Sequence, residues 1–195
     1  SIPSSVGGVF GEATSGTLSN VSVSNVEINL TNKQEGSSYI TIFGGLVGEV
    51  ETLTISGNSS FTGTIKIDGN AGKFYGGGIV GRATGTEANS LNIGNQEGVD
   101  NNIVSNATIE FNNIATDSTY YDGGIRGTGT TSGDKPEDDS YIISNSKYYG
   151  DIIFNGTKQE TDSNNETTYS LSNAKIIVGG IAGTNIKGGN LTNNW

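Results

Sequence analysis

A five-residue pattern, Gly-Gly followed by two mainly aliphatic residues and a third Gly, occurs five times in the chain. The five copies span residues 7–11, 44–48, 77–81, 123–127 and 179–183. Their first glycines are 37, 33, 46 and 56 residues apart. Self-similarity at such a period indicates a repeat architecture, in which each unit packs on its neighbours. This pentad constrains the fold more than any other feature.

Two further elements follow each pentad. After a polar loop comes a short strand-like run that Asn ends, at residues 18–20, 53–58, 91–95, 141–145 and 191–193. The third element has the alternation of a strand with one buried face. Residues 56–68 align without a gap with 143–155, which pairs Phe61 with Tyr148 and Ile65 with Ile152, and residues 23–30 align with 104–111. No run of ten residues shows helical periodicity with caps.

A unit of three short strands cannot bury its own apolar face, but stacked units share a continuous core. The sequence therefore predicts an all-β chain, a right-handed parallel β-solenoid (β-helix) of about five repeats with essentially no helix, as one unit over 1–195. The handedness follows from the general preference of parallel crossovers. We expect one coil per repeat, with two coils as the alternative. The extra length of the later repeats predicts loop insertions at 128–140 and 156–169.

Glycine makes up 31 of the 195 residues, a content that is also compatible with a flexible chain. Alternating Ile and Val argue for order instead. We expect the pentad glycines to permit sharp bends, positive φ and close approach between coils. Alternation predicts that the third pentad residues point inward (Val9, Leu46, Ile79, Ile125, Ile181) and the fourth outward (Phe10, Val47, Val80, Arg126, Ala182). The glycines assigned to the structural repeat are Gly44, Gly45, Gly48, Gly77, Gly78, Gly81, Gly123, Gly124, Gly127, Gly179, Gly180 and Gly183.

The chain contains no His, Cys or Met, and its 10 Lys and Arg against 20 Asp and Glu give a formal charge of -10. Imidazole bases, thiolate nucleophiles, Cys or His zinc sites and disulfides are therefore excluded. The acidic balance argues against nucleic acid or an anionic membrane as partner. No apolar stretch reaches the ~18 residues of a transmembrane segment. These absences favour a structural or adhesive role over an enzyme.

The units, Gly-Gly-aliphatic-aliphatic-Gly with a polar loop and a Ser-Asn strand end, resemble the GLUG-type repeats of bacterial cell-surface and secreted adhesin-like proteins. They are also similar to the glycine-aliphatic repeats of polymorphic outer-membrane proteins, which have β-helical passenger domains. The resemblance covers most of the chain and implies an extracellular or surface-displayed stalk or adhesin. It carries no catalytic residues.

We accordingly expect a non-catalytic module whose partner is a host or matrix glycan or protein. The alternative is a filament or matrix subunit in which the solenoid ends of two copies pair. Because the unit that begins at Gly179 is incomplete, we expect the polypeptide to continue past Trp195 or another chain to cover that end.

Tyrosines and acidic residues supply the candidate ligand sites. In the pairs Tyr120-Tyr121 and Tyr148-Tyr149 one ring of each should be exposed, and exposed Tyr beside Asn and Asp suits sugars or peptides. The alternative is that these rings only cover the surface. A possible calcium site consists of Asp134, Glu137, Asp138 and Asp139, with Asp117 and Asp122 earlier in the chain. Its spacing is not that of an EF-hand, which favours a solvated loop. No other cofactor is expected.

Two further residue sets were assigned from their places beside strands. Asp68, Glu110 and Asp151 end or flank third elements and are the carboxylates available for an alternative, polysaccharide-cleaving function. The asparagines that follow the second strands predict an internal ladder of amides at the corners, since Asn tolerates the left-handed conformation. They are Asn20, Asn58, Asn95, Asn145 and Asn193.

Overall fold

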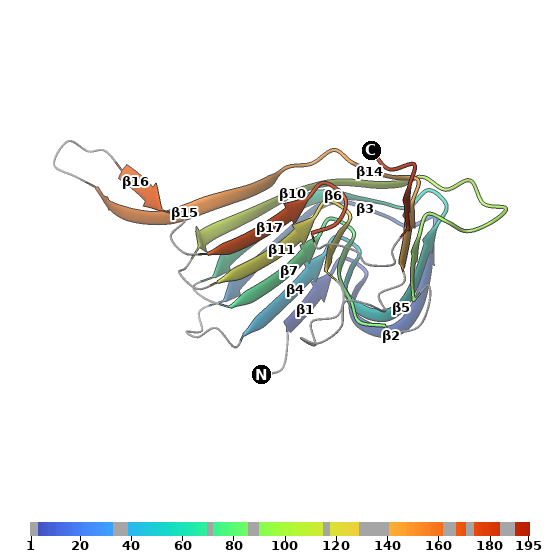
Figure 1. The fold of residues 1–195 in the computed structure, drawn as a ribbon, viewed down its shortest axis with the longest axis horizontal. Helices are drawn as coiled ribbons and strands as arrows, with labels where there is room; N and C mark the ends of the chain where they lie inside the picture. The colour runs from blue at the N-terminus through green and yellow to red at the C-terminus, as the bar shows by residue number, and fades with distance from the viewer. Residues whose placement is uncertain are drawn as a thin grey trace.

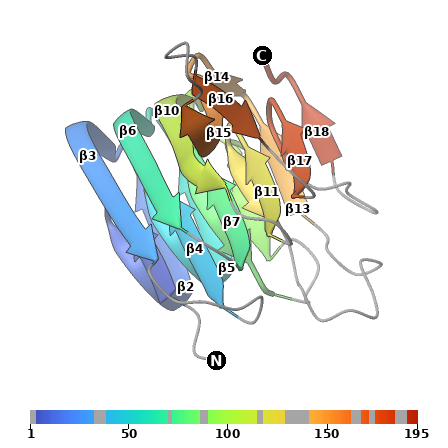
Figure 2. The same cartoon turned by 90° about the vertical axis from the view of Figure 1, so that its left-hand side faces the viewer.

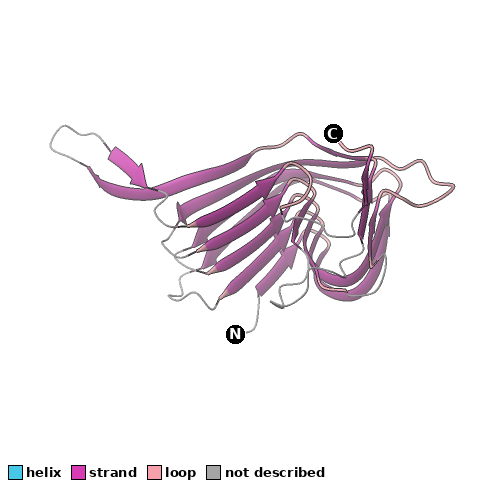
Figure 3. Ribbon diagram, in the orientation of Figure 1, coloured by secondary structure: helices cyan, strands magenta, loops and turns pink. Residues whose placement is uncertain are grey.

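The computed structural model describes residues 4–32, 39–69, 72–85, 90–114, 118–128, 141–161, 167–170, 174–183 and 190–195. All regular secondary structure in these ranges is β-strand (Figure 3). Within them no helix is long and apolar enough to cross a membrane. The prediction of an all-β chain without helix is therefore confirmed for the described residues.

The strands form three sheets. Sheet A contains β1 (Ser4–Gly7), β4 (Ile40–Gly44), β7 (Lys73–Gly77), β11 (Thr119–Gly123) and β17 (Lys175–Gly179). Sheet B contains β2 (Phe10–Ser19), β5 (Val47–Ser56), β8 (Val80–Ala83), β9 (Leu91–Ile93), β12 (Arg126–Thr128), β13 (Tyr141–Ser144) and β18 (Asn190–Thr192). Sheet C contains β3 (Ser22–Asn32), β6 (Ser60–Gly69), β10 (Ile103–Ile114), β14 (Ser146–Tyr148), β15 (Ile152–Thr161) and β16 (Thr167–Ser170).

The chain passes through sheets A, B and C in turn, and each return to a sheet adds a strand beside an earlier one. In sheet A the strands lie side by side in the order β1, β4, β7, β11, β17 (Figure 1). In sheet C the turned view shows β3, β6, β10 and β15 in the same succession (Figure 2). All pairings between the described strands are parallel except that of β15 with β16. That antiparallel hairpin occupies part of the predicted insertion at 156–169, whereas most of the insertion at 128–140 lies outside the described residues.

The pentads of successive passes lie in register. Gly44 pairs with Gly7 on one side and with Gly77 on the other, and Gly123 continues the series between Gly77 and Gly179. Successive pentads are therefore one strand spacing apart, ~4.8 Å. The repeat seen in the sequence is thus a column of glycines at one edge of sheet A.

The third elements also pair nearly as their sequences align. Phe61 and Tyr148 both pair with Ser105, and the apolar positions further along stay in register. From Val26 onward the alignment of 23–30 with 104–111 matches the observed register. Before Val26 it differs from the observed register by one residue. The cause is a β-bulge at Asn25, whose φ is 57°. A bulge adds one residue to one strand, which a gapless alignment cannot register.

The predicted outward column of fourth pentad residues is wrong. Val47, Val80 and Arg126 are at most 1% exposed, and of this column Phe10, on the edge strand β2, is clearly exposed. At each corner two successive N–H groups donate to one carbonyl, as Leu46 and Val47 do to Ile79. In an extended strand successive N–H groups point opposite ways. The chain therefore turns inside the pentad, and in the three middle pentads both the third and the fourth residue are buried, whereas Val9 of the first pentad, predicted to point inward, is exposed to 37%.

Steric contacts explain why most pentad glycines lack a side chain. A Cβ on the first, such as Gly44, would lie closer than 3.0 Å to the Val47 carbonyl. A Cβ on the second, such as Gly45, would meet the Phe61 ring of sheet C and the carbonyl of Gly78. The third glycines Gly48, Gly81, Gly127 and Gly183 abut backbone of an earlier pass, and close backbone approach of this kind is one of the established uses of glycine.

The pentad glycines do not adopt positive φ, although the sequence predicted that they would. The described glycines with positive φ are Gly57, Gly72, Gly94 and Gly98, none of which belongs to a pentad. The pentad glycines therefore provide close approach between passes without a left-handed backbone.

Sheets A and C pack face to face through aromatic side chains. Phe74 and Tyr120 of sheet A stack with ring centroids 4.8 Å apart, and Phe111 of sheet C meets both edge-on. Phe111 in turn stacks on Phe154 at 4.7 Å. Edge-to-face and stacked pairs add stability beyond the area that they bury. This cluster fixes which face of each sheet points inward.

Replacing a buried pentad glycine should destabilise the chain, whereas the same change at an open pentad should not. We expect Gly45→Ala to lower the free energy of unfolding by about 2 kcal/mol, because its Cβ would overlap Phe61 and backbone. Gly180→Ala is the matched control, since a Cβ there meets nothing within 4 Å. Urea unfolding of both variants measures the difference. Equal midpoints would contradict the role assigned to close approach.

Candidate functional site

The outer face of sheet C is a lattice of polar side chains. The inward positions of β6 and β10 are apolar and buried, as Ile65 and Ile109 are, so the residues between them point outward. Pairing across the strands places the outward residues in columns, of which the best defined are Ser24, Thr62 and Asn106; Glu27, Thr64 and Thr108; Asn29, Lys66 and Glu110; and Thr31, Asp68 and Asn112.

Tyr149 and Asp151 extend this lattice. Both are exposed, Tyr149 to 65%, and they lie two residues apart between β14 and the start of β15. The N–H of Tyr149 donates to the Ser105 carbonyl, and the Asp151 carbonyl accepts from Ile109. The structure therefore gathers one predicted tyrosine and three predicted carboxylates, with Asp68 and Glu110 on the neighbouring strands, on a single sheet face.

The carboxylates on this face are solvated or engaged with polar neighbours. The Asp68 carboxylate accepts a hydrogen bond from the Asn113 amide at 2.6 Å. Glu27 accepts from Asn29 and pairs with Lys66, and these contacts lower its pKa, the Asn29 hydrogen bond most. Asp68 and Asp151 are exposed. Asp68 and Asp151 therefore present hydrogen-bond acceptors to solvent.

The other three predicted tyrosines have different surroundings. Tyr120 is buried in the aromatic cluster between sheets A and C and offers no surface to a ligand. Tyr148 points inward against Gly124 and donates its hydroxyl to the Ala107 carbonyl. Burial and then the Asp122 carboxyl raise the pKa of Tyr148. Tyr121 is half-buried on the outer face of sheet A, because Tyr120 occupies the inner face.

The corner asparagines bond along the stacking direction, but to backbone. Asn20, Asn145 and Asn193 have φ between 48° and 54°, as predicted for corner residues. Asn58 and Asn95 do not, and Gly57 and Gly94 have positive φ there instead. The Asn20 amide oxygen accepts from the Asn58 N–H, and the Asn145 amide donates to the Gly94 carbonyl. The expected ladder therefore consists of side chain to backbone bonds, and Asn20 is exposed at its end.

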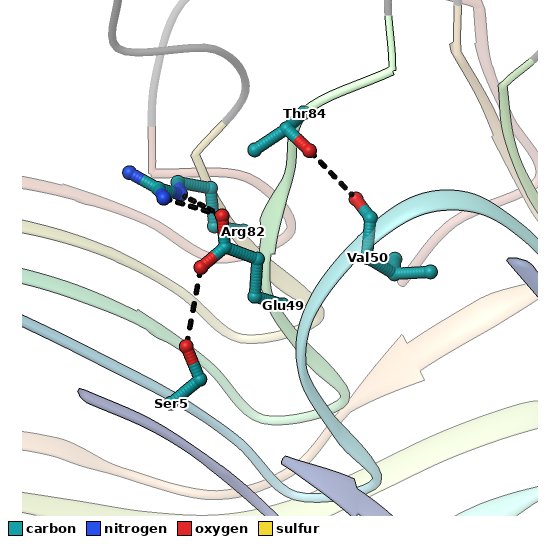
Figure 4. A network of polar contacts seen from close by, with 5 residues as sticks. All are labelled: Ser5, Glu49, Val50, Arg82 and Thr84. Atoms are coloured by element: carbon teal, nitrogen blue, oxygen red, sulfur yellow. Dashed lines mark hydrogen bonds and ion pairs between the residues drawn. The ribbon is translucent and has the colours of Figure 1, made fainter. Parts of the chain in front are cut away.

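An ion pair lies between sheet B and the outer face of sheet A. Glu49 of β5 and Arg82 of β8 are paired in register, and the Arg82 Nε donates to Glu49 Oε1 at 3.0 Å. The hydroxyl of Ser5 in β1 donates to the second carboxylate oxygen at 3.1 Å (Figure 4). Both charged side chains are about nine-tenths buried. A buried pair whose oxygens are all hydrogen-bonded holds its neighbours in a fixed geometry.

The Arg82 guanidinium also lies 5.6 Å from the centre of the Tyr75 ring. Tyr75 stacks on Tyr121 of the next pass, with centroids 5.5 Å apart and an angle of 25° between the rings. Lys175 places its ammonium 5.8 Å from the Tyr121 ring. An aromatic pair with a cation at each end thus follows the outer face of sheet A.

Asp122 is an acid inside the protein. Its side chain has no exposed surface, and among the described residues neither carboxylate oxygen has a well-formed hydrogen bond. Its carboxyl lies over Gly76, beside the Phe43 ring. Burial raises the pKa of Asp122 to about 8, against a smaller opposing effect of the Gly123 N–H. At neutral pH the folded protein therefore keeps this carboxyl mainly protonated.

The sequence contains a signal that Asp122 is buried, although grouping it with the acidic loop residues conceals that signal. Val6, Phe43 and Val178 hold the same place in sheet A, one residue before the pentad. Asp122 is an acid at a position that is apolar in these strands. In β7 this position is Gly76, and its lack of a side chain leaves room for the Asp122 carboxyl.

The proposed calcium ligands Asp134, Glu137, Asp138 and Asp139 lie outside the described residues. Among the residues that are described, no three acidic side chains come together in an arrangement for a metal ion. Comparison of the chain with protein-family models, with curated proteins and with solved structures gives no match.

Ionisation of Asp122 should weaken the fold as the pH rises. The pKa of Asp122 in the folded protein is above the ordinary value of an aspartate. The stability that its protonated carboxyl contributes is therefore fully present below about pH 4 and is lost as the pH rises toward 8. We expect the stability of Asp122→Asn relative to the parent to increase by about 1.4 kcal/mol per pH unit between pH 5 and 7. Urea unfolding at both pH values tests this. A difference that does not change with pH would contradict it.

Proposed function

We propose that the chain is a right-handed parallel β-solenoid segment of a secreted or surface-displayed adhesin-like protein. In this role it has no chemistry of its own and serves as a stalk that presents a glycan- or protein-binding surface. The observation that carries the proposal is the register of the pentads, in which successive returns of the chain add parallel strands to three sheets. Each repeat then corresponds to one coil.

Two further arguments support the solenoid. Parallel strands linked through other sheets almost always cross over with a right-handed sense, which gives the proposed hand. The second pentad glycines face side chains of sheet C at four successive levels, Val23, Phe61, Ser105 and Tyr148. This is the repeated cross-section expected when units stack along one axis.

The location and biological role are inferred from the repeat chemistry. The unit resembles GLUG-type repeats of bacterial surface and secreted proteins, and the absence of Cys and His with a charge of -10 suits a solubilised extracellular stalk. Such stalks expose long sheet faces on which loops and side chains contact partners.

The outer face of sheet C is the surface that we assign to the ligand. Its exposed Tyr149 offers a ring for stacking on a sugar, and the surrounding amides, hydroxyls and carboxylates offer hydrogen-bond donors and acceptors. The parallel strands repeat these groups every ~4.8 Å, so a ligand with repeating polar groups is suited to this face.

A filament subunit that assembles through its ends is the alternative function. The edge strand β2 exposes Phe10 to 39%, and Val9 just before it is exposed to 37%. At the opposite side Val178 and Leu191 are exposed to 47% and 46%. Exposed strand edges with apolar side chains favour pairing with another chain.

Substitution of Tyr149 tests the binding surface. On a glycan array the protein should bind at least one glycan, and Tyr149→Ala should weaken that binding about tenfold, as loss of ~1.4 kcal/mol of stacking predicts. Tyr149→Phe is the matched control and should retain most of it, because the ring is kept. Binding unaffected by Tyr149→Ala would contradict this surface, and release of reducing sugar from a polysaccharide would overturn the non-catalytic role.

The mass in solution distinguishes the two candidate functions. For a binding module, light scattering should give the monomer mass at every concentration. For an end-to-end assembly the mass should grow with concentration, and Phe10→Glu should return it to the monomer because a buried charge opposes pairing. A monomer at all concentrations contradicts the filament.

A further inference from the structure

The outer face of sheet A carries two lysines beside the tyrosine stack. Lys73 of β7, Thr119 of β11 and Lys175 of β17 pair in register and form one column across three adjacent strands. Tyr75, Tyr121 and Ile177 form the next column, two residues further along the same strands. Residues two apart in a strand share a face, so all six lie on the outer face.

The spacing of this column suits one anionic group. Lys73 and Lys175 are two strands apart, ~9.6 Å between their backbones. Thr119, half-buried between them, presents a hydroxyl at the midpoint. Lysine has a flexible four-carbon stem, so both ammonium groups can converge on an anion that lies over Thr119.

These two lysines lie together on one sheet face, whereas Lys147 is partly buried on β14 of sheet C. Lys66 pairs with Glu27, Arg82 pairs with Glu49, and Arg126 is buried beneath sheet B with the Tyr141 ring at 3.9 Å. Lys73 and Lys175 are exposed, and neither forms an ion pair with another of the described residues. In a chain with a net charge of -10, two exposed cations on one face create a local site for an anion.

The neighbouring tyrosines provide a flat surface that is held in place. Tyr75 is 2% exposed and lies between Tyr121 and the buried Arg82, which Glu49 fixes in turn. Tyr121 remains half-buried, with Tyr75 stacked on its ring and the Lys175 ammonium 5.8 Å from the ring centre. A ring fixed by its neighbours loses little entropy when a ligand contacts it.

We propose that this face of sheet A binds a carboxylate-bearing saccharide, a hexuronate unit of an acidic glycan. The pyranose ring lies against the solvent side of Tyr121, its carboxylate lies between Lys73 and Lys175, and the Thr119 hydroxyl donates a hydrogen bond to it. The proposal goes beyond the surface assigned on sheet C, since it uses a different sheet, a different tyrosine and a charged ligand. The combination of an aromatic face with cations one column away favours a ring that carries an acid over a neutral sugar.

Titration with tetragalacturonate tests the proposal, and its fully methyl-esterified form serves as the uncharged ligand. We expect calorimetry to detect binding of the acid that weakens as salt is raised, and little binding of the ester. Lys73→Gln and Lys175→Gln should each weaken binding about two- to fivefold, as expected for exposed charge pairs, and the double variant should weaken it more. Tyr121→Ala should also weaken binding.

Matched variants separate this site from the one on sheet C. Lys66→Gln removes a lysine from sheet C, and Tyr149→Ala removes its exposed ring; both should leave tetragalacturonate binding unchanged. Equal binding of acid and ester, no binding of the acid, or an equal loss in Lys66→Gln would overturn the proposal. Glycan binding through Tyr149 could persist in each of these cases, so the two proposals fail separately. Thermal unfolding of each variant confirms that it is folded.

Discussion

Close approach of backbones at the pentads is the constraint on which the rest of the structure depends. At each corner the first glycine abuts a carbonyl of its own pentad; at the first four the second glycine faces sheet C, and from Gly48 onward the third abuts an earlier pass. Two successive N–H groups share one carbonyl, which turns the chain sharply between the two aliphatic residues. A methyl group at these places would separate the passes. Because the corners stay close, sheets A and C can meet through Phe74, Tyr120 and Phe111.

Polar side chains have different surroundings in the interior and on the outer faces of the sheets. Inside, Asp122 and Ser105 hold polar atoms without hydrogen-bond partners, beside places where Gly76 and Gly78 leave room. Such groups reduce stability. Outside, polar side chains repeat in columns, neutral and of both charges on sheet C and cationic with tyrosine on sheet A. The two faces therefore suit different ligands.

Much of the fold follows from patterns that each pass repeats. The pentads, the alternation of the third strands and the corner asparagines predict parallel strands without helix, and even the pairing of Ile65 and Ile152 with one partner strand. The errors have local causes. A bulge at Asn25 shifts one alignment by a residue, and the turn inside each pentad defeats the alternation that placed Val47 and Arg126 outside. Of the candidate tyrosines, Tyr149 is fully available, whereas Tyr120 belongs to the core.

The sequence by itself determined the repeat, its strand character and the chemistry that the chain lacks, because periodicity and composition are local properties of the polymer. Only the tertiary structure decided which residues become neighbours. Lys73 and Lys175 are far apart in the chain and look scattered among few cations, yet the parallel register places them in one column with Thr119. From the sequence Asp122 likewise resembles a surface acid, but in the folded protein sheets A and C enclose it. Burial and register arise from packing between passes, which no single segment encodes.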